Sequence, residues 1–126
     1  MLLVTQKGRE ETLPWPPIAG VERLYKEDQK RPCGQHYKML VFNVRLSGIV
    51  RVSMNACGES PLLHPLFLLF YGKGMGGVHL AVSDRIKDSG AAASFYATGG
   101  ETYTAVFTSY FPEETGSFTF NIEVER

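Results

Sequence analysis

The chain has 126 residues, which is long enough for one domain that buries roughly two thirds of the surface its unfolded form exposes. Hydrophobic residues make up 44% of the chain and charged residues 21%, as in ordinary soluble globular proteins, so disorder is excluded as the overall state. Thirteen basic and thirteen acidic residues cancel, which excludes a broad field of one sign that would attract nucleic acid. We therefore expect a single domain over residues 1–126 with no nucleic-acid partner.

The location of the protein is predicted from three features. The segment from Met1 to Gln6 lacks the basic region of a signal peptide, and the apolar run 66–71 is far shorter than a membrane span. Two cysteines, Cys33 and Cys57, fit a reducing compartment better than a disulfide scaffold. We expect a soluble, cytoplasmic protein.

The N-terminal third differs in composition from the rest of the chain. After a short candidate strand at 2–6, residues 8–34 are rich in charge and proline, and Trp15 stands between prolines. Proline removes backbone donors and fixes extended geometry, so 8–34 is predicted to be an extended Pro-rich connector. Within it, 21–28 is expected to form a short helical turn. Trp15 is either an interaction anchor or a cover for an open sheet edge.

From Gln35 onward the chain has the spacing and alternation of a β-sandwich. Residues 40–46 and 49–54 alternate with period two around Ser47-Gly48, which predicts a hairpin. The run 66–71 is apolar throughout and is expected to be covered on both faces. Further strands are expected at 78–82 and 91–97, joined by a polar link over 84–90.

The last quarter carries the clearest strand pattern of the chain. Residues 103–126 are predicted to form a hairpin of two strands joined by a Pro/Glu/Gly corner at 112–116, the second strand with Phe118, Phe120, Ile122 and Val124 on its buried face. Together with the preceding strands, this predicts an all-β fold, an antiparallel β-sandwich of about eight strands.

This closing segment resembles the third domain of calpains, a C2-like β-sandwich, over Tyr103 to Phe120. The positions that carry the resemblance are Tyr103, Thr108, Ser109, Tyr110, Pro112, Gly116 and Phe118. Two positions depart from the family pattern: Phe107 replaces a usual proline, and Phe111 replaces a usual polar residue. The family aromatic at 110 implies that Tyr110 packs inward, and alternation then turns Phe111 outward.

The resemblance implies a non-catalytic accessory or protein-interaction module of a calpain-like protein. The expected partner is a protein, or the protease domain of a longer parent chain. The runner-up hypothesis is a peripheral module that binds a phospholipid membrane through Lys73, Phe111 and the loop ends, with calcium dependence left open. A carbohydrate- or ligand-binding sandwich is the third hypothesis, and it requires a row of exposed aromatic residues on one sheet.

Three sequence features contain residue types that bind nucleotides or metal ions in other proteins. The run Gly72–Gly77 matches the glycine spacing of a dinucleotide loop, but the residues after it alternate like a strand, so a flexible hairpin loop is expected instead. Cys33, His36, Cys57 and His64 supply zinc-ligand residue types without the spacing of a zinc finger or ribbon. With three Asp in the chain, a calcium cluster of the conventional kind is not expected either.

The predicted site residues are therefore few. We expect no catalytic residue, because no nucleophile turn is recognisable, and no cofactor or metal. The interaction candidates are Trp15, Lys73 and Phe111.

Overall fold

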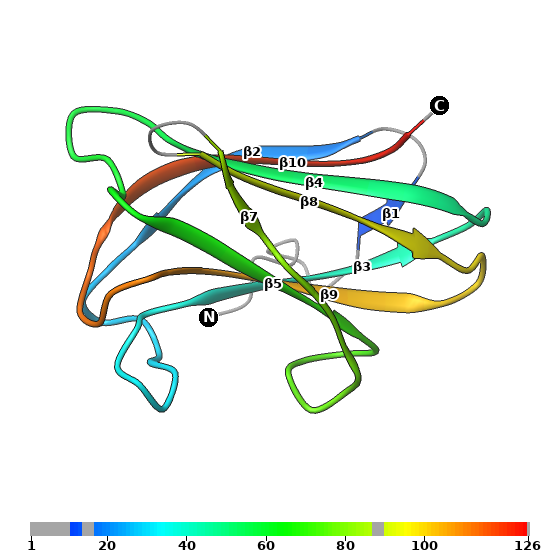
Figure 1. Ribbon diagram of the computed structural model, residues 1–126, viewed down its shortest axis with the longest axis horizontal. Coiled ribbons are helices and arrows are strands. Elements are labelled where there is room, and N and C mark those ends of the chain that lie inside the picture. The colour runs from blue at the N-terminus through cyan, green and yellow to red at the C-terminus, as the bar shows by residue number, and fades with distance from the viewer. Residues whose placement is uncertain (1–10, 14–16, 87–89, 126) are drawn as a thin grey trace.

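The computed structural model describes residues 11–13, 17–86 and 90–125. These residues form two five-stranded β-sheets that face each other across a shared interior (Figure 1). Sheet 1 has the order β1-β3-β9-β5-β6, with bounds Glu11–Leu13 for β1, Lys38–Val44 for β3, Thr102–Ser109 for β9, Pro65–Tyr71 for β5 and His79–Val82 for β6. Sheet 2 has the order β2-β10-β4-β8-β7, with bounds Ile18–Leu24 for β2, Gly116–Val124 for β10, Gly48–Ala56 for β4, Gly90–Ala97 for β8 and Asp84–Ile86 for β7.

The pairing is antiparallel between all neighbouring strands described here except β1 and β3, which run parallel. Eight of the described strands have four or more residues, while β1 and β7 have three each. The predicted antiparallel β-sandwich of about eight strands is thus confirmed. No helix among the described residues is long and apolar enough to cross a membrane.

The main core lies between the two sheets and follows the period-two pattern of the sequence. From sheet 2 it takes Val50, Val52, Met54, Phe118, Phe120 and Ile122, and from sheet 1 it takes Leu40, Phe42, Val44, Phe67, Leu69, Ala105 and Phe107. Burying one large apolar side chain of this kind stabilises the fold by about 1.5–3 kcal/mol. The shared core therefore holds the two sheets together.

Both predicted hairpins are wrong, because each pair of strands is split between the sheets. β3 lies in sheet 1 and β4 in sheet 2, and likewise β9 lies in sheet 1 and β10 in sheet 2. Alternation shows which face of a strand is buried, but both sheets of a sandwich bury one face, so the pattern does not assign a strand to a sheet. The corners 45–47 and 110–115 consequently connect the two layers.

The glycine run 72–77 does form the predicted hairpin loop, since β5 and β6 pair in an antiparallel manner on either side of it. The loop is fixed against sheet 1 by one side chain. The Gly74 amide donates to the Thr104 hydroxyl oxygen at 2.8 Å, and this hydroxyl donates to the Gly72 carbonyl at 2.7 Å. Met75 thereby packs on a second apolar cluster, on the outer face of sheet 1, made of Tyr37, Leu68 and Val106. β5 is covered on both faces, as its unbroken apolar run predicts.

The predicted connector 8–34 is corrected by the structure. Residues 18–24 form β2, which pairs along its whole length with β10, and 11–13 form β1 at the edge of sheet 1. The expected helical turn at 21–28 is instead the end of β2 followed by a turn. The charges of this region had masked the buried Ile18 and Leu24, whose spacing suits a strand. The candidate strand 2–6 and Trp15 lie outside the described residues.

The segment between β6 and β8 departs from prediction in one detail. The expected polar link 84–90 contains the short strand β7, which pairs with the start of β8. β8 itself is a strand, as predicted from its position. In β6 the core-facing residue is Ala81, and its larger neighbours Leu80 and Val82 are exposed. His79 is exposed, as expected.

Candidate interaction surface

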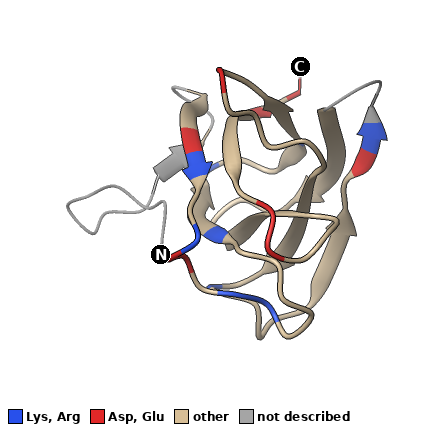
Figure 2. Cartoon of the chain, turned by 90° about the vertical axis from the view of Figure 1, so that its left-hand side faces the viewer, with Lys and Arg blue, Asp and Glu red and all other residues tan. Residues whose placement is uncertain are grey.

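Three connections meet at one end of the sandwich, which we call the loop end. They are 25–37 between β2 and β3, 57–64 between β4 and β5, and 110–115 between β9 and β10. The registers bring them together, because β5 starts opposite the end of β9 with Pro65 beside Ser109, and β3 starts near the same point. Figure 2 looks onto this end, where acidic and basic segments are interspersed and neither sign dominates.

A buried ion pair fixes the first of these connections. Lys38 occupies a core-facing position of β3, two residues before Leu40, and its side chain is 1% exposed. Its Nζ lies 3.1 and 3.0 Å from Oδ1 and Oδ2 of Asp28. The Tyr25 ring lies 4.9 Å from the same ammonium, and the Tyr25 amide donates to Asp28 Oδ2 at 2.8 Å. A buried ammonium requires such partners, so it dictates how residues 25–28 lie on the sandwich.

His36 continues this buried network. Its side chain is buried, with Nδ1 at 3.0 Å from the Asp28 carbonyl oxygen, and its own carbonyl accepts a hydrogen bond from the Thr108 hydroxyl at 2.7 Å. A tight turn precedes His36, in which the Gly34 amide donates to the Arg31 carbonyl at 2.8 Å. His36 therefore has a structural role that links the connection to β9.

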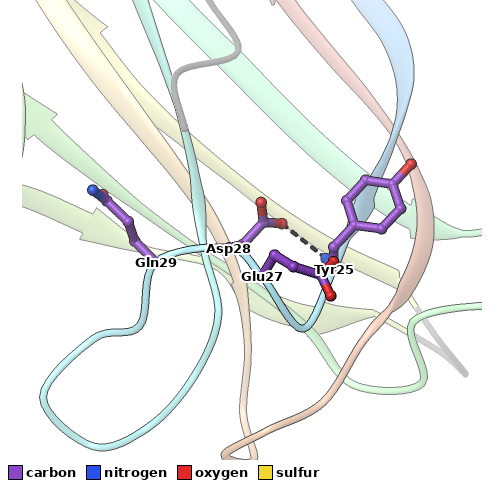
Figure 3. Close-up of a pocket in the computed structure, with 4 residues that line it drawn as sticks. All are labelled: Tyr25, Glu27, Asp28 and Gln29. Carbon is purple, nitrogen blue, oxygen red and sulfur yellow. Dashed lines mark hydrogen bonds between the residues drawn. The ribbon is translucent and has the colours of Figure 1, made fainter.

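A cavity of about 360 Å³ opens beside the ion pair, lined by Tyr25, Glu27, Asp28 and Gln29 (Figure 3). All four come from one stretch of chain. Gln29 is held by the Tyr37 hydroxyl, which donates to Gln29 Oε1 at 2.8 Å, while Glu27 is exposed. The size falls at the lower limit of small-ligand sites, and the Asp28 carboxylate is already engaged by Lys38 and Tyr25. The cavity offers an aromatic ring, an exposed carboxylate and an amide.

The corner 110–115 is tied to both neighbouring connections. The Glu113 amide donates to the Gly34 carbonyl at 3.0 Å, and its carboxylate lies 3.2 Å from Lys30 Nζ. Gln35 Nε2 donates to the Tyr110 carbonyl at 3.2 Å. On the other side, the Tyr110 amide donates to the His64 carbonyl at 3.0 Å. These bonds hold the corner in one conformation.

Glu114 ties the corner 110–115 to the 57–64 connection through two further hydrogen bonds. Its Oε1 accepts the His64 backbone amide at 2.9 Å, and its Oε2 lies 2.8 Å from His64 Nδ1. The fixed His64 ring contacts the Phe111 ring edge-on, with 4.7 Å between the ring centroids. Phe111 thus packs against the ring of a residue that Glu114 holds by two hydrogen bonds, one to the His64 backbone amide and one to the His64 ring.

The prediction for Phe111 is confirmed, and that for Tyr110 is wrong. Phe111 is 54% exposed and Tyr110 is 39% exposed, so both side chains reach solvent. Strict alternation holds along a strand, but β9 ends at Ser109 and both residues already belong to the corner. Arg85 lies 5.9 Å from the centre of the Tyr110 ring. Leu63, which precedes His64, is 56% exposed, and we refer to three exposed apolar side chains of the 57–64 and 110–115 connections, Leu63, Tyr110 and Phe111, as the apolar patch of the loop end.

Lys73 and Phe111 are not brought together. Lys73 follows β5, which runs from the loop end to the opposite end, where Tyr71 pairs with Tyr103. It is exposed there, in the glycine loop. Trp15, the third interaction candidate, lies outside the described residues.

The four candidate zinc ligands lie in different environments, and two of them already make other hydrogen bonds. Cys33 is exposed, Cys57 is half-buried, His36 is bonded within the buried network and His64 is clamped by Glu114. In the described part of the chain no group of three or more His, Cys, Asp and Glu residues is arranged to hold a metal ion. The glycine run is followed by strand β6 and not by the helix that a dinucleotide loop needs.

Comparison with known proteins bears on the fold. No protein-family model and no curated protein sequence matches this chain. Solved structures do match, and two of them match over nearly the whole chain. The likeness shows the fold alone.

The first is the pre-peptidase C-terminal domain of a collagenase from Bacillus anthracis, with a TM-score of 0.58 and 14% identity over 93% of this chain and 95% of that one. The second is CorA, a surface-associated copper-binding protein important in copper acquisition by Methylomicrobium album BG8, with a TM-score of 0.58 and 8% identity over 99% of this chain and 100% of that one. At such identities neither function transfers to this chain.

The side chains that fix the loop end were not predicted from the sequence. Lys38 could have indicated such a contact. It lies on the same face of the strand as the core residues Leu40 and Phe42, and a buried lysine needs a carboxylate as its partner. Nothing in the sequence identified Asp28 as that carboxylate. The pairing of His64 with Glu114 joins residues 50 positions apart and depends on the corner 110–115 between the sheets, where the sequence pattern predicts a hairpin turn.

Proposed function

We propose that this chain is a non-catalytic protein-interaction module that binds its partner through the loop end, as an accessory domain of a calpain-like protein. The observation that supports the proposal most directly is the apolar patch, whose aromatic residues are exposed and yet held by surrounding bonds. Interface hot spots are enriched in aromatic residues that fill a pocket of the partner. Phe111 is the anchor in this proposal.

The rigidity of the patch is what distinguishes it from single exposed apolar residues, which are common on any surface. The corner is bonded to the 25–37 connection through Glu113 and to the 57–64 connection through Tyr110 and Glu114. Ordering a flexible side chain on binding costs about 0.5–1.5 kcal/mol, and a pre-ordered anchor avoids part of that cost. An exposed ring backed by a clamped His64 is suited to this use.

The membrane alternative is less well supported in the form that uses both Lys73 and Phe111. The two residues stand at opposite ends of sheet 1, so a flat bilayer in contact with one end does not reach the other. The loop end also displays both signs of charge, whereas anionic bilayers attract clusters of lysine and arginine (Figure 2). The carbohydrate hypothesis requires a row of exposed aromatic residues on one sheet, and the exposed aromatic residues within the described strands, Tyr71 and Tyr96, belong to different sheets.

The experiment is site-specific photo-crosslinking in cells that express the parent protein. A benzophenone amino acid replaces Phe111, and the matched control replaces Tyr96, which is more exposed but lies on β8 away from the loop end. We expect a discrete protein adduct from position 111, absent from position 96 and lost when Leu63→Ser is added. Adducts of equal pattern from both positions would refute the loop end as the binding surface.

A liposome experiment distinguishes the membrane hypothesis from a protein partner. Vesicles of phosphatidylcholine with phosphatidylserine are sedimented with the chain, with and without calcium, and we expect the chain to stay in the supernatant. Co-sedimentation that is lost in Phe111→Ser would favour the membrane hypothesis over a protein partner.

A further inference from the structure

β2 is the longest edge strand whose outer side is unpaired among the described residues. It stands at the end of sheet 2, and residues 18–24 pair with β10 in an unbroken register. An edge strand presents a row of backbone amides and carbonyls that a further strand can pair with. The Arg23 amide shows where this row points, since its nitrogen lies 3.4 Å from a carboxylate oxygen of Glu22. By alternation, the amides of residues 19 and 21 face the same way.

The other edge strands are shorter than β2. β1, β6 and β7 have three, four and three residues. β6 runs directly into β7 through Ser83, whose amide donates to the Phe67 carbonyl at 2.9 Å and whose hydroxyl accepts the Phe67 amide at 2.9 Å, so the chain itself bridges the two sheets on that side. Short strands and bridged edges discourage pairing with another chain. β2 has seven residues, with no proline, no lysine and no bulge.

The side chains of β2 allow an antiparallel copy of the same strand to pair along all seven residues. Val21 is 69% exposed on the outer face of sheet 2. If two β2 strands pair antiparallel with the two-fold axis at Val21, Val21 meets its own counterpart, Glu22 meets Gly20, and Arg23 meets Ala19. Shifting the axis to Glu22 or Arg23 places like charges directly opposite, which destabilises a ladder. A chain of zero net charge adds no long-range repulsion between copies.

We propose that β2 is a strand-pairing interface on which a second copy of this chain docks antiparallel, with Val21 opposite Val21 of the second copy, to give a two-fold dimer with a continuous ten-stranded sheet. The occupant is another copy because an antiparallel β2 centred on Val21 pairs all seven residues of the strand without placing like charges opposite, and the same patch then serves both copies, as in a two-fold interface. The interface lies along the side of the sandwich and does not depend on the loop end.

Disulfide trapping tests the register. In a background with Cys33→Ser and Cys57→Ala, Val21→Cys should cross-link to itself in mild oxidant, because directly opposite residues fall within disulfide range. Ala19→Cys alone should not, since it is displaced from its own copy by four residues, or about 13 Å. A mixture of Ala19→Cys and Arg23→Cys should cross-link to each other. Equal cross-linking of Val21→Cys and Ala19→Cys alone would indicate random collision and overturn the proposal.

Analytical ultracentrifugation tests the dimer itself. At about 100 μM, where a dimer with a micromolar Kd is nearly complete, we expect twice the chain mass of 14.0 kDa. Val21→Lys should return the mass to that of one chain, since it places two ammonium groups opposite each other. Ser94→Lys, on the same face three strands away on β8, is the control and should stay dimeric. A monomeric native chain, or a dimer that survives Val21→Lys with the fold intact by circular dichroism, would overturn the proposal.

Discussion

Removing the carboxylate of Asp28 should destabilise the domain far more than its position in a connection suggests. Asp28→Ala deletes two contacts to the Lys38 ammonium, at 3.0 and 3.1 Å, and the acceptor of the Tyr25 amide. It takes the Asp28 carboxylate away from a cation with 1% exposure, and breaking a buried pair in this way costs about 3–5 kcal/mol. A urea titration followed by far-ultraviolet circular dichroism measures the loss of unfolding free energy.

A double-mutant cycle separates the pair from the packing. Lys38→Met keeps most of the side-chain volume and removes the charge, so Asp28→Ala in that background should cost much less than alone, with a coupling of about 2 kcal/mol or more. The matched control is the exposed pair Lys30–Glu113, whose side chains are 44% and 71% exposed, and Glu113→Ala should cost about 1 kcal/mol or less. If Asp28→Ala costs no more than Glu113→Ala, the pair is not the anchor that its geometry indicates.

Gly116→Ala should destabilise by about 3 kcal/mol or more, because φ is 144° and an added Cβ lies 2.5 Å from the Leu62 amide nitrogen; an unchanged melting temperature would contradict this. Phe111→Ser should change the unfolding free energy by about 1 kcal/mol or less, and a loss near that of a core aromatic would place the ring in the interior. The hydrogen bond to Glu101, with its negative charge, raises the pKa of Tyr71 above 10.0, so this contribution to stability is present at neutral pH and lost as pH rises through the raised value. In a carbon-13 titration of the tyrosine rings Glu101→Gln should lower that pKa, and no change would exclude the bond. Millimolar calcium should leave the melting temperature unchanged, whereas a site occupied at 100 times its Kd would add about 2.7 kcal/mol.

The fold class was readable from the sequence, because period-two alternation directly reports a buried face. Val50, Val52 and Met54 and the residues Phe118, Phe120 and Ile122 are buried as the pattern predicts. The assignment of strands to sheets was not readable, since a corner such as 45–47 leaves the alternation on both sides intact whether the chain reverses within a sheet or crosses to the other one. β2 was not predicted for a different reason. Its residues Glu22 and Arg23 are charged, and the segment therefore resembles a polar linker.

Of the residues at the loop end, the exposure of Phe111 could be predicted from the sequence, and the contacts that hold it could not. Phe111 was identified because it replaces a polar residue in the calpain-type pattern, and the structure shows it exposed. Its support by His64 and Glu114, and the anchoring of the 25–37 connection by Lys38 and Asp28, depend on contacts between distant segments. A single sequence states which residues are charged or apolar, but it does not state which of them meet.

The two proposed surfaces have a joint geometric consequence. β2 runs toward the loop end, because Leu24 immediately precedes the 25–37 connection. An antiparallel β2 pair therefore turns the two loop ends in opposite directions, at the far ends of a continuous sheet. Two partner molecules can then bind one dimer without contact, but a single bivalent partner gains avidity only if its linker spans the length of both sandwiches. With a tandem partner, shortening the linker should leave the affinity for the Val21→Lys monomer unchanged and abolish the extra affinity for the dimer. Avidity that persists with a linker of a few residues would mean that the loop ends lie on the same side, and that the copies do not pair through β2 in the antiparallel sense.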